Sequence, residues 1–167
     1  MIFVTLGTQK QSFKRLLEEI ENCPLLRNEE IIAQVGHTKY TSEKITTIDF
    51  LDSDEFNNYI RSCEFVVAHG GVGSIFSALL NNKKVLAVPR LKKFGEHVDN
   101  HQIEICEKLA NMNHIVYYNP ENSAYEEKPE TMETKINFLR SNYFEPYTQD
   151  SSYISKVDNA IEDLLLS

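Results

Sequence analysis

Basic residues are scarce in this chain of 167 residues. Its 17 lysines and arginines stand against 25 aspartates and glutamates, which gives a formal net charge of −8. Non-specific binding to nucleic acid needs a basic surface, so the composition argues against a nucleic-acid-binding protein. Any phosphate group that the chain binds must therefore be held by local geometry rather than by the overall field of the protein.

Cysteines are also few. Cys23, Cys63 and Cys106 are widely spaced and form no CxxC pair, which excludes a zinc ribbon and a thioredoxin-like redox motif. We expect all three to be core residues without a chemical role. Reduced thiols fit a cytoplasmic protein.

Long apolar runs are missing as well. No segment approaches the ~20 apolar residues of a membrane-spanning helix, and Met1–Leu6 lacks the basic start and the length of a signal peptide. We interpret these six residues as the first strand of the fold. The length and the 41% hydrophobic content predict one domain with a substantial core. If the protein works at a membrane, another molecule brings it there.

Strand-like and helix-like segments alternate along the chain. Apolar, β-branched runs predict strands at residues 2–6, 30–35, 44–50, 65–68, 85–89 and 115–118. Apolar residues spaced three and four apart predict helices that start near Ser12, at Asp52 or Ser53, at Ser74 and near Val98. The alternation predicts an α/β fold, a single Rossmann-like parallel sheet with helices on both faces.

The composition changes after Pro120. Residues 122–134 are acidic and polar and are expected to form a surface loop or an irregular helical approach, and residues 136–147 are rich in aromatic side chains. A final amphipathic helix is expected over about residues 151–166. We therefore divide the chain into a Rossmann-like domain of residues 1–120 and a helical tail of residues 121–167, which packs on that domain or on a partner.

Two polar loops follow neighbouring predicted strands. The run Phe65–Ala68 stops at His69-Gly70-Gly71-Val72-Gly73-Ser74, and a helical pattern follows at once. Such a turn brings backbone N–H groups close to a phosphate, and the helix N-terminus favours negative charge. The second loop, residues 90–102, follows the next strand. Because ligands of open parallel sheets bind outside the carboxyl ends of the strands, we expect both loops and the Gly7-Thr8-Gln9 turn to build one site.

With both loops in view, the sequence resembles the C-terminal, donor-binding half of GT-B glycosyltransferases, and among them family 28. The shared pattern runs from Phe3–Thr8 through His69–Ser74 to Val88–Arg90 and Gly95–Gln102, and covers about residues 1–118. The most similar members are small stand-alone subunits of dolichol-type GlcNAc transferases and of two-component capsule or exopolysaccharide transferases. The resemblance implies a UDP-sugar as the donor substrate and no cofactor.

The resemblance also implies roles for single residues. His69 takes the place of a side chain beside the donor diphosphate, and the turn that holds the phosphates comprises Gly70, Gly71, Gly73 and Ser74.

Three further groups of residues carry implied donor contacts. Phe50 and Leu51 match the end of a strand that lines the uracil pocket. Gly7 and Thr8 match a glycine turn that faces the cleft. The residues that match the contacts to the donor sugar are Asn100, His101 and Gln102.

Ser77 departs from the pattern of the wider superfamily, and the Asp52-Ser53-Asp54 triplet lies outside it. The wider superfamily usually has a Glu eight residues after the histidine of the glycine loop, where it binds the ribose hydroxyls, and this chain has Ser77. The ribose contact is therefore weaker or is supplied elsewhere. Asp52-Ser53-Asp54 resembles the metal-binding DxD of another glycosyltransferase class, but acidic residues before an amphipathic helix favour capping. We predict no metal site.

An inverting transferase needs a general base for the acceptor hydroxyl. In two-domain relatives the N-terminal half supplies that base and most of the acceptor site. Here Glu96 and His97 are the candidate bases within the chain. We expect a second, membrane-anchored protein subunit that holds a lipid-linked saccharide acceptor, and hence a cytoplasmic protein that lies at the inner face of the membrane through its partner.

The leading interpretation is the catalytic subunit of a metal-independent, inverting UDP-sugar transferase in capsule or exopolysaccharide synthesis, with galactose as the first guess for the sugar. The alternative is a non-catalytic nucleotide-sugar-binding or activating subunit. A nucleotide-sugar epimerase would need both halves in one chain, and a dinucleotide-binding module would need GxGxxG after the first strand. Arg90, Lys92 and Lys93 could face anionic lipid or a diphosphate, or be merely solvated.

Overall fold

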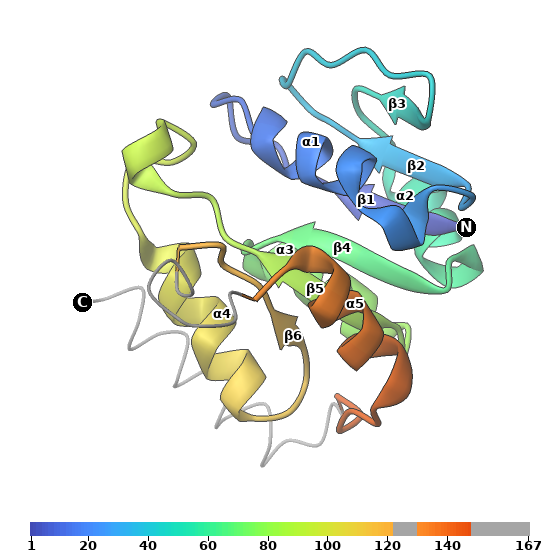
Figure 1. Ribbon diagram of the computed structural model, residues 1–167, viewed down its shortest axis with the longest axis vertical. Helices are drawn as coiled ribbons and strands as arrows, with labels where there is room; N and C mark the ends of the chain where they lie inside the picture. Colours follow the sequence, from blue (N-terminus) through green and yellow to red (C-terminus); the bar gives the residue numbers. More distant parts are fainter. Residues whose placement is uncertain (122–129, 148–167) are drawn as a thin grey trace.

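The computed structural model describes residues 1–121 and 130–147. Its centre is one sheet of six parallel strands in the order β3-β2-β1-β4-β5-β6 (Figure 1). The strands are β1 Ile2–Thr5, β2 Ile31–Gln34, β3 Ile45–Ile48, β4 Phe65–His69, β5 Lys84–Val88 and β6 Val116–Tyr117. The predicted fold class, a single parallel α/β sheet, is confirmed.

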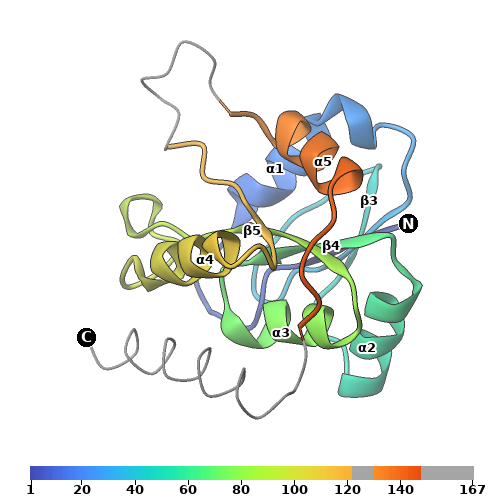
Figure 2. The same ribbon diagram turned by 90° about the horizontal axis from the view of Figure 1, so that it is seen from below.

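Helices cover both faces of this sheet (Figure 2). Five α-helices lie in the described residues: α1 Lys14–Asn22, α2 Ser53–Ser62, α3 Val72–Leu80, α4 His101–Asn111 and α5 Met132–Ser141, with short 3-10 helices at Pro24–Leu26 and Lys92–Phe94. The apolar sides of α1 and α5 share one core cluster with alternate residues of β1 and β4. Those of α2, α3 and α4 share the other. No helix in these two ranges is long and apolar enough to cross a membrane.

The central strands are buried from both sides, which explains their unbroken apolar runs. Every residue of β1 and β4 is buried. The three cysteines are buried and free, as the sequence predicted for core residues. The strand order reverses between β1 and β4, because the chain moves outward to β2 and β3 and then returns to the other side of β1. In open α/β sheets this switch point is where ligands bind.

Several expected helix starts differ from the structure. Ser12 does not cap α1, whose N-cap position is Phe13 without a side-chain hydrogen bond. Helix α3 begins at Val72, before Ser74, and α4 begins only at His101 because residues 91–100 form a braced loop.

Helix α5 is the main element that the sequence interpretation missed. Residues 132–134, expected as part of a surface loop or an irregular helical approach, belong to it, and Thr131 and Thr134 form a capping box at its start. Residues 122–129 of that expected segment lie outside the described residues. Met132, Ile136 and Leu139 are buried in the same core as β1, so this part of the predicted tail packs on the sheet. The boundary at residue 120 stays a prediction, and the expected helix at 151–166 lies outside the described residues.

Candidate functional site

A polar cleft of about 440 Å³ lies at the carboxyl edge of the sheet, beside the switch point. Its residues come from the ends of β1, β2 and β4 and from the first turns of α2 and α3. They are Gly7, Thr8, Gln34, Leu51, Asp52, Ser53, Phe56, Asn57, His69, Gly73, Ser74 and Ser77. A larger cavity of about 520 Å³ lies elsewhere, between the start of β5 and the end of α5. We take the polar cleft of about 440 Å³ as the functional site because the polar loops at the switch point line it.

His69 is packed between two glycines in this cleft. Gly7 has a φ of +73°, and a methyl group added there would lie 2.5 Å from Cε1 and Nε2 of the His69 ring. A methyl group added at Gly71 would overlap the same ring at Nε2. Both positions therefore need glycine so that the imidazole can lie against the main chain.

The His69 ring is neutral at physiological pH. Burial, helped by the nearby Arg90 charge, lowers the pKa of His69 to about 4. Its Nδ1 lies 3.4 Å from the Thr5 carbonyl oxygen, which can only accept, so Nδ1 carries the proton and Nε2 has the lone pair. The positive potential of the cleft must then come from another group.

The N-terminus of α3 is that group. Gly71 occupies its N-cap position, where it offers no side-chain acceptor, and the first turn has no acidic residue. The other helix end at the cleft, that of α2, is already satisfied: the Asp52 carboxylate accepts the Glu55 N–H at 2.8 Å in a capping box. Asp52 thus caps a helix, as predicted. An anion in the cleft is favoured at α3 and repelled at α2.

The far side of the cleft is built by buried Gln34. Its Oε1 accepts the Leu51 N–H at 3.3 Å and so joins the end of β2 to the start of α2. Leu51 lines the cleft, whereas Phe50 is half exposed outside the lining and meets the His37 ring edge-on at 5.1 Å. Ser77 lines the cleft too, and its hydroxyl donates to the Gly73 carbonyl at 2.8 Å.

Arg90 faces neither lipid nor a diphosphate and is not solvated, so both alternatives that the sequence left open are wrong for this residue. Its side chain is fully buried and donates to the carbonyl oxygens of Leu6 at 2.7 Å, Gln11 at 2.7 Å and Glu96 at 3.1 Å. The guanidinium also lies over the Phe13 ring. Burial lowers the pKa of Arg90 to about 10, so it remains charged. It joins the loop after β1 to the loop after β5.

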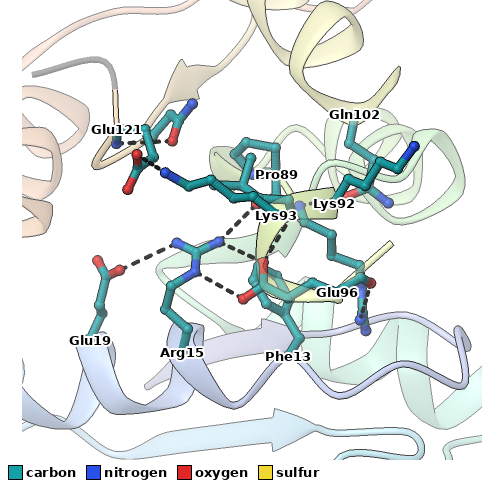
Figure 3. Close-up of polar contacts among 12 residues, drawn as sticks. Phe13, Arg15, Glu19, Pro89, Lys92, Lys93, Glu96, Gln102 and Glu121 are labelled. Carbon is teal, nitrogen blue, oxygen red and sulfur yellow. Dashed lines mark hydrogen bonds and ion pairs between the residues drawn. The ribbon is translucent and has the colours of Figure 1, made fainter. Parts of the chain in front are cut away.

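Glu96 is held in the same network (Figure 3). Arg15 donates to both of its carboxylate oxygens, from Nε and Nη2 at 2.9 Å each, and the Leu91 N–H donates to Oε2 at 2.9 Å. The carboxylate is buried. To serve as a general base it would have to leave this ion pair. Lys93 forms an ion pair with Glu121 in the same view.

The rest of the second loop lies beside the cleft rather than in its lining. Gln102 is buried and its Oε1 accepts the Arg90 N–H at 3.0 Å, which leaves its amide NH₂ for other contacts. The Asn100 Oδ1 accepts the Lys92 N–H at 3.1 Å, and His101 is partly exposed at the start of α4. Gly70 lies against Gln102 and Cys106, where a methyl group would clash, so α4 packs closely on the end of β4.

The structure thus brings six of the predicted site residues into one cleft: Gly7, Thr8, Leu51, His69, Gly73 and Ser74. It places eight others around it, namely Phe50, Gly70, Gly71, Glu96, His97, Asn100, His101 and Gln102. The sequence interpretation did not assign Gln34, Phe56 or Asn57 to the site, and no motif marks them, because only the packing of α2 beside β2 brings them there. Among the described residues, no group of His, Cys, Asp and Glu side chains could hold a metal ion.

Comparison with known proteins adds a family and a fold. The family model for the glycosyltransferase family 28 C-terminal domain matches residues 1–164. The UDP-N-acetylglucosamine transferase subunit ALG13 of Candida albicans is 29% identical over 100 residues, which is 60% of this chain and 32% of that protein. The chain therefore corresponds to about a third of the length of this relative.

Two solved structures share the fold. The glycotransferase of kitacinnamycin superposes with a TM-score of 0.57 at 12% identity, over 99% of this chain and 40% of that one. The solution structure of ALG13 gives a TM-score of 0.52 at 20% identity, over 83% of this chain and 92% of that one. The fold is thus similar to part of a glycosyltransferase and to nearly all of the ALG13 structure.

The packing of His69 predicts opposite effects of two glycine substitutions. Gly71→Ala puts a methyl group into the imidazole and should lower the free energy of unfolding by about 1–3 kcal/mol. Gly73→Ala meets open space within α3 and should raise it by up to ~1 kcal/mol. Urea denaturation of both variants measures the difference. Equal effects would show that Gly71 does not confine His69.

The low pKa of His69 predicts a pH dependence of stability. In the unfolded chain His69 is protonated below pH ~6.5, whereas in the folded protein it is protonated only below about pH 4. The free energy of unfolding therefore falls as the pH falls from ~6.5 to about 4. The wild type should lose on the order of 3 kcal/mol more than His69→Gln between pH 7 and pH 4. Denaturant titrations at each pH measure this loss, and parallel curves for the two proteins would contradict it.

Proposed function

The chain belongs to the glycosyltransferase family 28 C-terminal domain family, and on this premise we propose that it is the donor-binding catalytic subunit of an inverting UDP-sugar glycosyltransferase. The observation that carries the proposal is the N-terminus of α3, which has no side-chain cap and opens into a polar cleft directly beside His69. The donor diphosphate lies there, held by main-chain N–H groups and by the Ser74 hydroxyl.

The reaction builds charge at that point. The bond between the sugar carbon and the diphosphate oxygen breaks, the diphosphate keeps the electron pair, and the acceptor oxygen forms the new bond to the sugar. The fixed dipole of α3 stabilises the developing negative charge without reorganisation. That charge also raises the pKa of His69, so the imidazole takes up a proton at Nε2 and donates it in a hydrogen bond to the leaving group. No metal ion is required in this scheme.

The remainder of the cleft suits the nucleoside. Leu51 and Phe56 offer apolar surface for the base, and Gln34 is the buried amide at that end. Ser77 is too short to replace a carboxylate, so we assign the ribose hydroxyls to Asp52, the N-cap of α2, and to Asn57 within α2, which line the same cleft. Their oxygens accept the hydrogen bonds that ribose hydroxyls donate.

One relative bears on the choice of donor sugar. Galactose is the sugar suggested by sequence, but the Candida albicans relative is a UDP-N-acetylglucosamine transferase subunit, and this favours UDP-N-acetylglucosamine as the donor. A role in capsule or exopolysaccharide synthesis stays a prediction. The word subunit in the name of that relative supports a protein partner, and we propose that this partner is membrane-anchored, presents a lipid-linked saccharide and holds the chain at the inner face of the membrane.

A charge placed at the diphosphate position tests this proposal. Ser74→Asp adds a carboxylate to the first turn of α3, where it caps the helix and leaves the fold intact. The same carboxylate repels a diphosphate, so affinity for UDP should fall at least ~10-fold, since 1.4 kcal/mol of repulsion is enough for that. The control is Asn137→Asp, which adds the same charge at an exposed position of α5 and should leave binding unchanged.

Thermal unfolding with UDP, UDP-N-acetylglucosamine, UDP-galactose and NAD measures these affinities. A ligand at 100 times its Kd adds ~2.7 kcal/mol of stability. The proposal expects stabilisation by the UDP compounds in the wild type and in Asn137→Asp only, with the largest effect identifying the donor. Equal stabilisation of Ser74→Asp, or stabilisation by NAD alone, would refute it. A chain that binds donor yet stays inactive with every partner would favour the non-catalytic alternative.

A further inference from the structure

His97 and Asp99 form an acid–base pair beside the cleft. Asp99 Oδ1 lies 3.0 Å from His97 Nδ1, and only 12% of the His97 side chain is exposed. On its other side, His97 Nε2 lies 3.5 Å from the side-chain amide nitrogen of Gln9, which directly follows Thr8 of the cleft lining. The pair thus joins the start of α4 to the loop after β1.

Asp99 is itself held in place by α4. The N–H of His101, the first residue of that helix, donates to Asp99 Oδ1 at 3.1 Å. Hydrogen bonds and the neighbouring His97 and His101 lower the pKa of Asp99 although burial opposes this, so the carboxylate is ionised and can only accept. Asp99 thus stands to His97 as the aspartate of a hydrolase triad stands to its histidine, where the carboxylate fixes one imidazole tautomer.

The two neighbours of His97 select the same tautomer. The Asp99 carboxylate requires the proton on Nδ1, and the Gln9 amide offers a donor to Nε2. The lone pair is then at Nε2, on the side of the β1 loop. The Asp99 N–H also lies 3.3 Å from Nδ1, but the shorter contact to an ionised oxygen decides the position of the proton.

The other charged or titratable groups near the pair have other partners. His69 on β4 is close enough that His97 contributes to lowering the pKa of His69, and His69 belongs to the proposed diphosphate site. His101 faces Asp99 Oδ2 at 3.9 Å. Arg90 donates to the Glu96 carbonyl next to His97. Glu96, the other candidate base, has both carboxylate oxygens bound to Arg15.

We propose that His97 is the general base of the transfer and that Asp99 is the positioning residue that keeps its Nε2 unprotonated, on the side of the loop after β1 that borders the cleft. The inference rests on the proposed function and deepens it. His97 Nε2 takes the proton of the acceptor hydroxyl while the acceptor oxygen bonds to the sugar carbon and the diphosphate leaves with its electron pair. The partner subunit then needs to present the acceptor but not to supply the base.

A transfer assay tests the roles of both residues. Membranes from cells that lack this chain are supplemented with purified variants, and label from UDP-N-acetylglucosamine or UDP-galactose is followed into lipid. His97→Gln should lower kcat at least ~100-fold, the range of general base catalysis, with unchanged affinity for UDP. Glu107→Gln, which removes one exposed charge from α4, is the matched control and should keep full activity.

Asp99 is tested by two conservative substitutions. Asp99→Asn removes the carboxylate that holds the His97 proton on Nδ1, so the maximum rate should fall ~10-fold or more. Asp99→Glu should restore part of the rate. An unchanged kcat in Asp99→Asn would remove Asp99 from the mechanism, and full activity of His97→Gln would remove His97 from the chemistry.

A second measurement does not depend on activity. Long-range ¹⁵N–¹H NMR correlations of the purified chain report the tautomer of each histidine. The proposal expects the neutral His97 to carry its proton on Nδ1 in the wild type, and a mixture of tautomers in Asp99→Asn. A proton on Nε2 in the wild type would overturn the proposal. If the wild type transfers no sugar with any donor, it is the proposed function that fails, while this measurement still decides the geometry of the pair.

Discussion

The arrangement of the site depends on one buried cation. The Arg90 guanidinium is closed off from solvent and held by three main-chain carbonyl oxygens, those of Leu6, Gln11 and Glu96. A buried charge is costly unless its hydrogen bonds and a counter-charge compensate it, and the Glu96 carboxylate supplies the counter-charge. Because Glu96 is in turn bound by Arg15 of α1, the loops after β1 and β5 are fixed to each other and to the helix layer. The position of His69 between Gly7 and Gly71 follows from this bracing.

Two electrostatic features lie at the edge of the cleft: the N-terminus of α3 and the His97–Asp99 pair. On the β4 side, the proposed diphosphate site depends on the dipole of α3, because the His69 ring without a ligand is neutral. On the β5 side an ionised Asp99 lies against His97. In the proposed mechanism, leaving-group stabilisation therefore takes place after β4 and proton removal in the loop after β5 of the same sheet. A site built from local geometry in this way is compatible with an anionic donor and a net charge of −8.

The fold and half of the candidate site could be predicted from the sequence because they depend on local patterns. Buried parallel strands are β-branched apolar runs, and a glycine turn between strand and helix marks the phosphate side. Tertiary pairing decided the rest. Nothing near Arg90 in sequence indicates that main-chain carbonyls will enclose it, Glu96 meets Arg15 81 positions away, and Gln34 reaches the cleft only through packing. Helix α5 was missed because its capping box begins in a polar stretch.

The central claim is that the donor diphosphate lies on the N-terminus of α3 beside His69. The most direct test is a titration of the ¹⁵N-labelled chain with UDP, followed through its backbone amide resonances. We expect the largest shifts at residues 71–74 and at Gly7 and Thr8, and further shifts at Leu51, Phe56 and Asn57, where the nucleoside is placed. Shifts centred on the cavity between the start of β5 and the end of α5, with residues 71–74 unmoved, would contradict it.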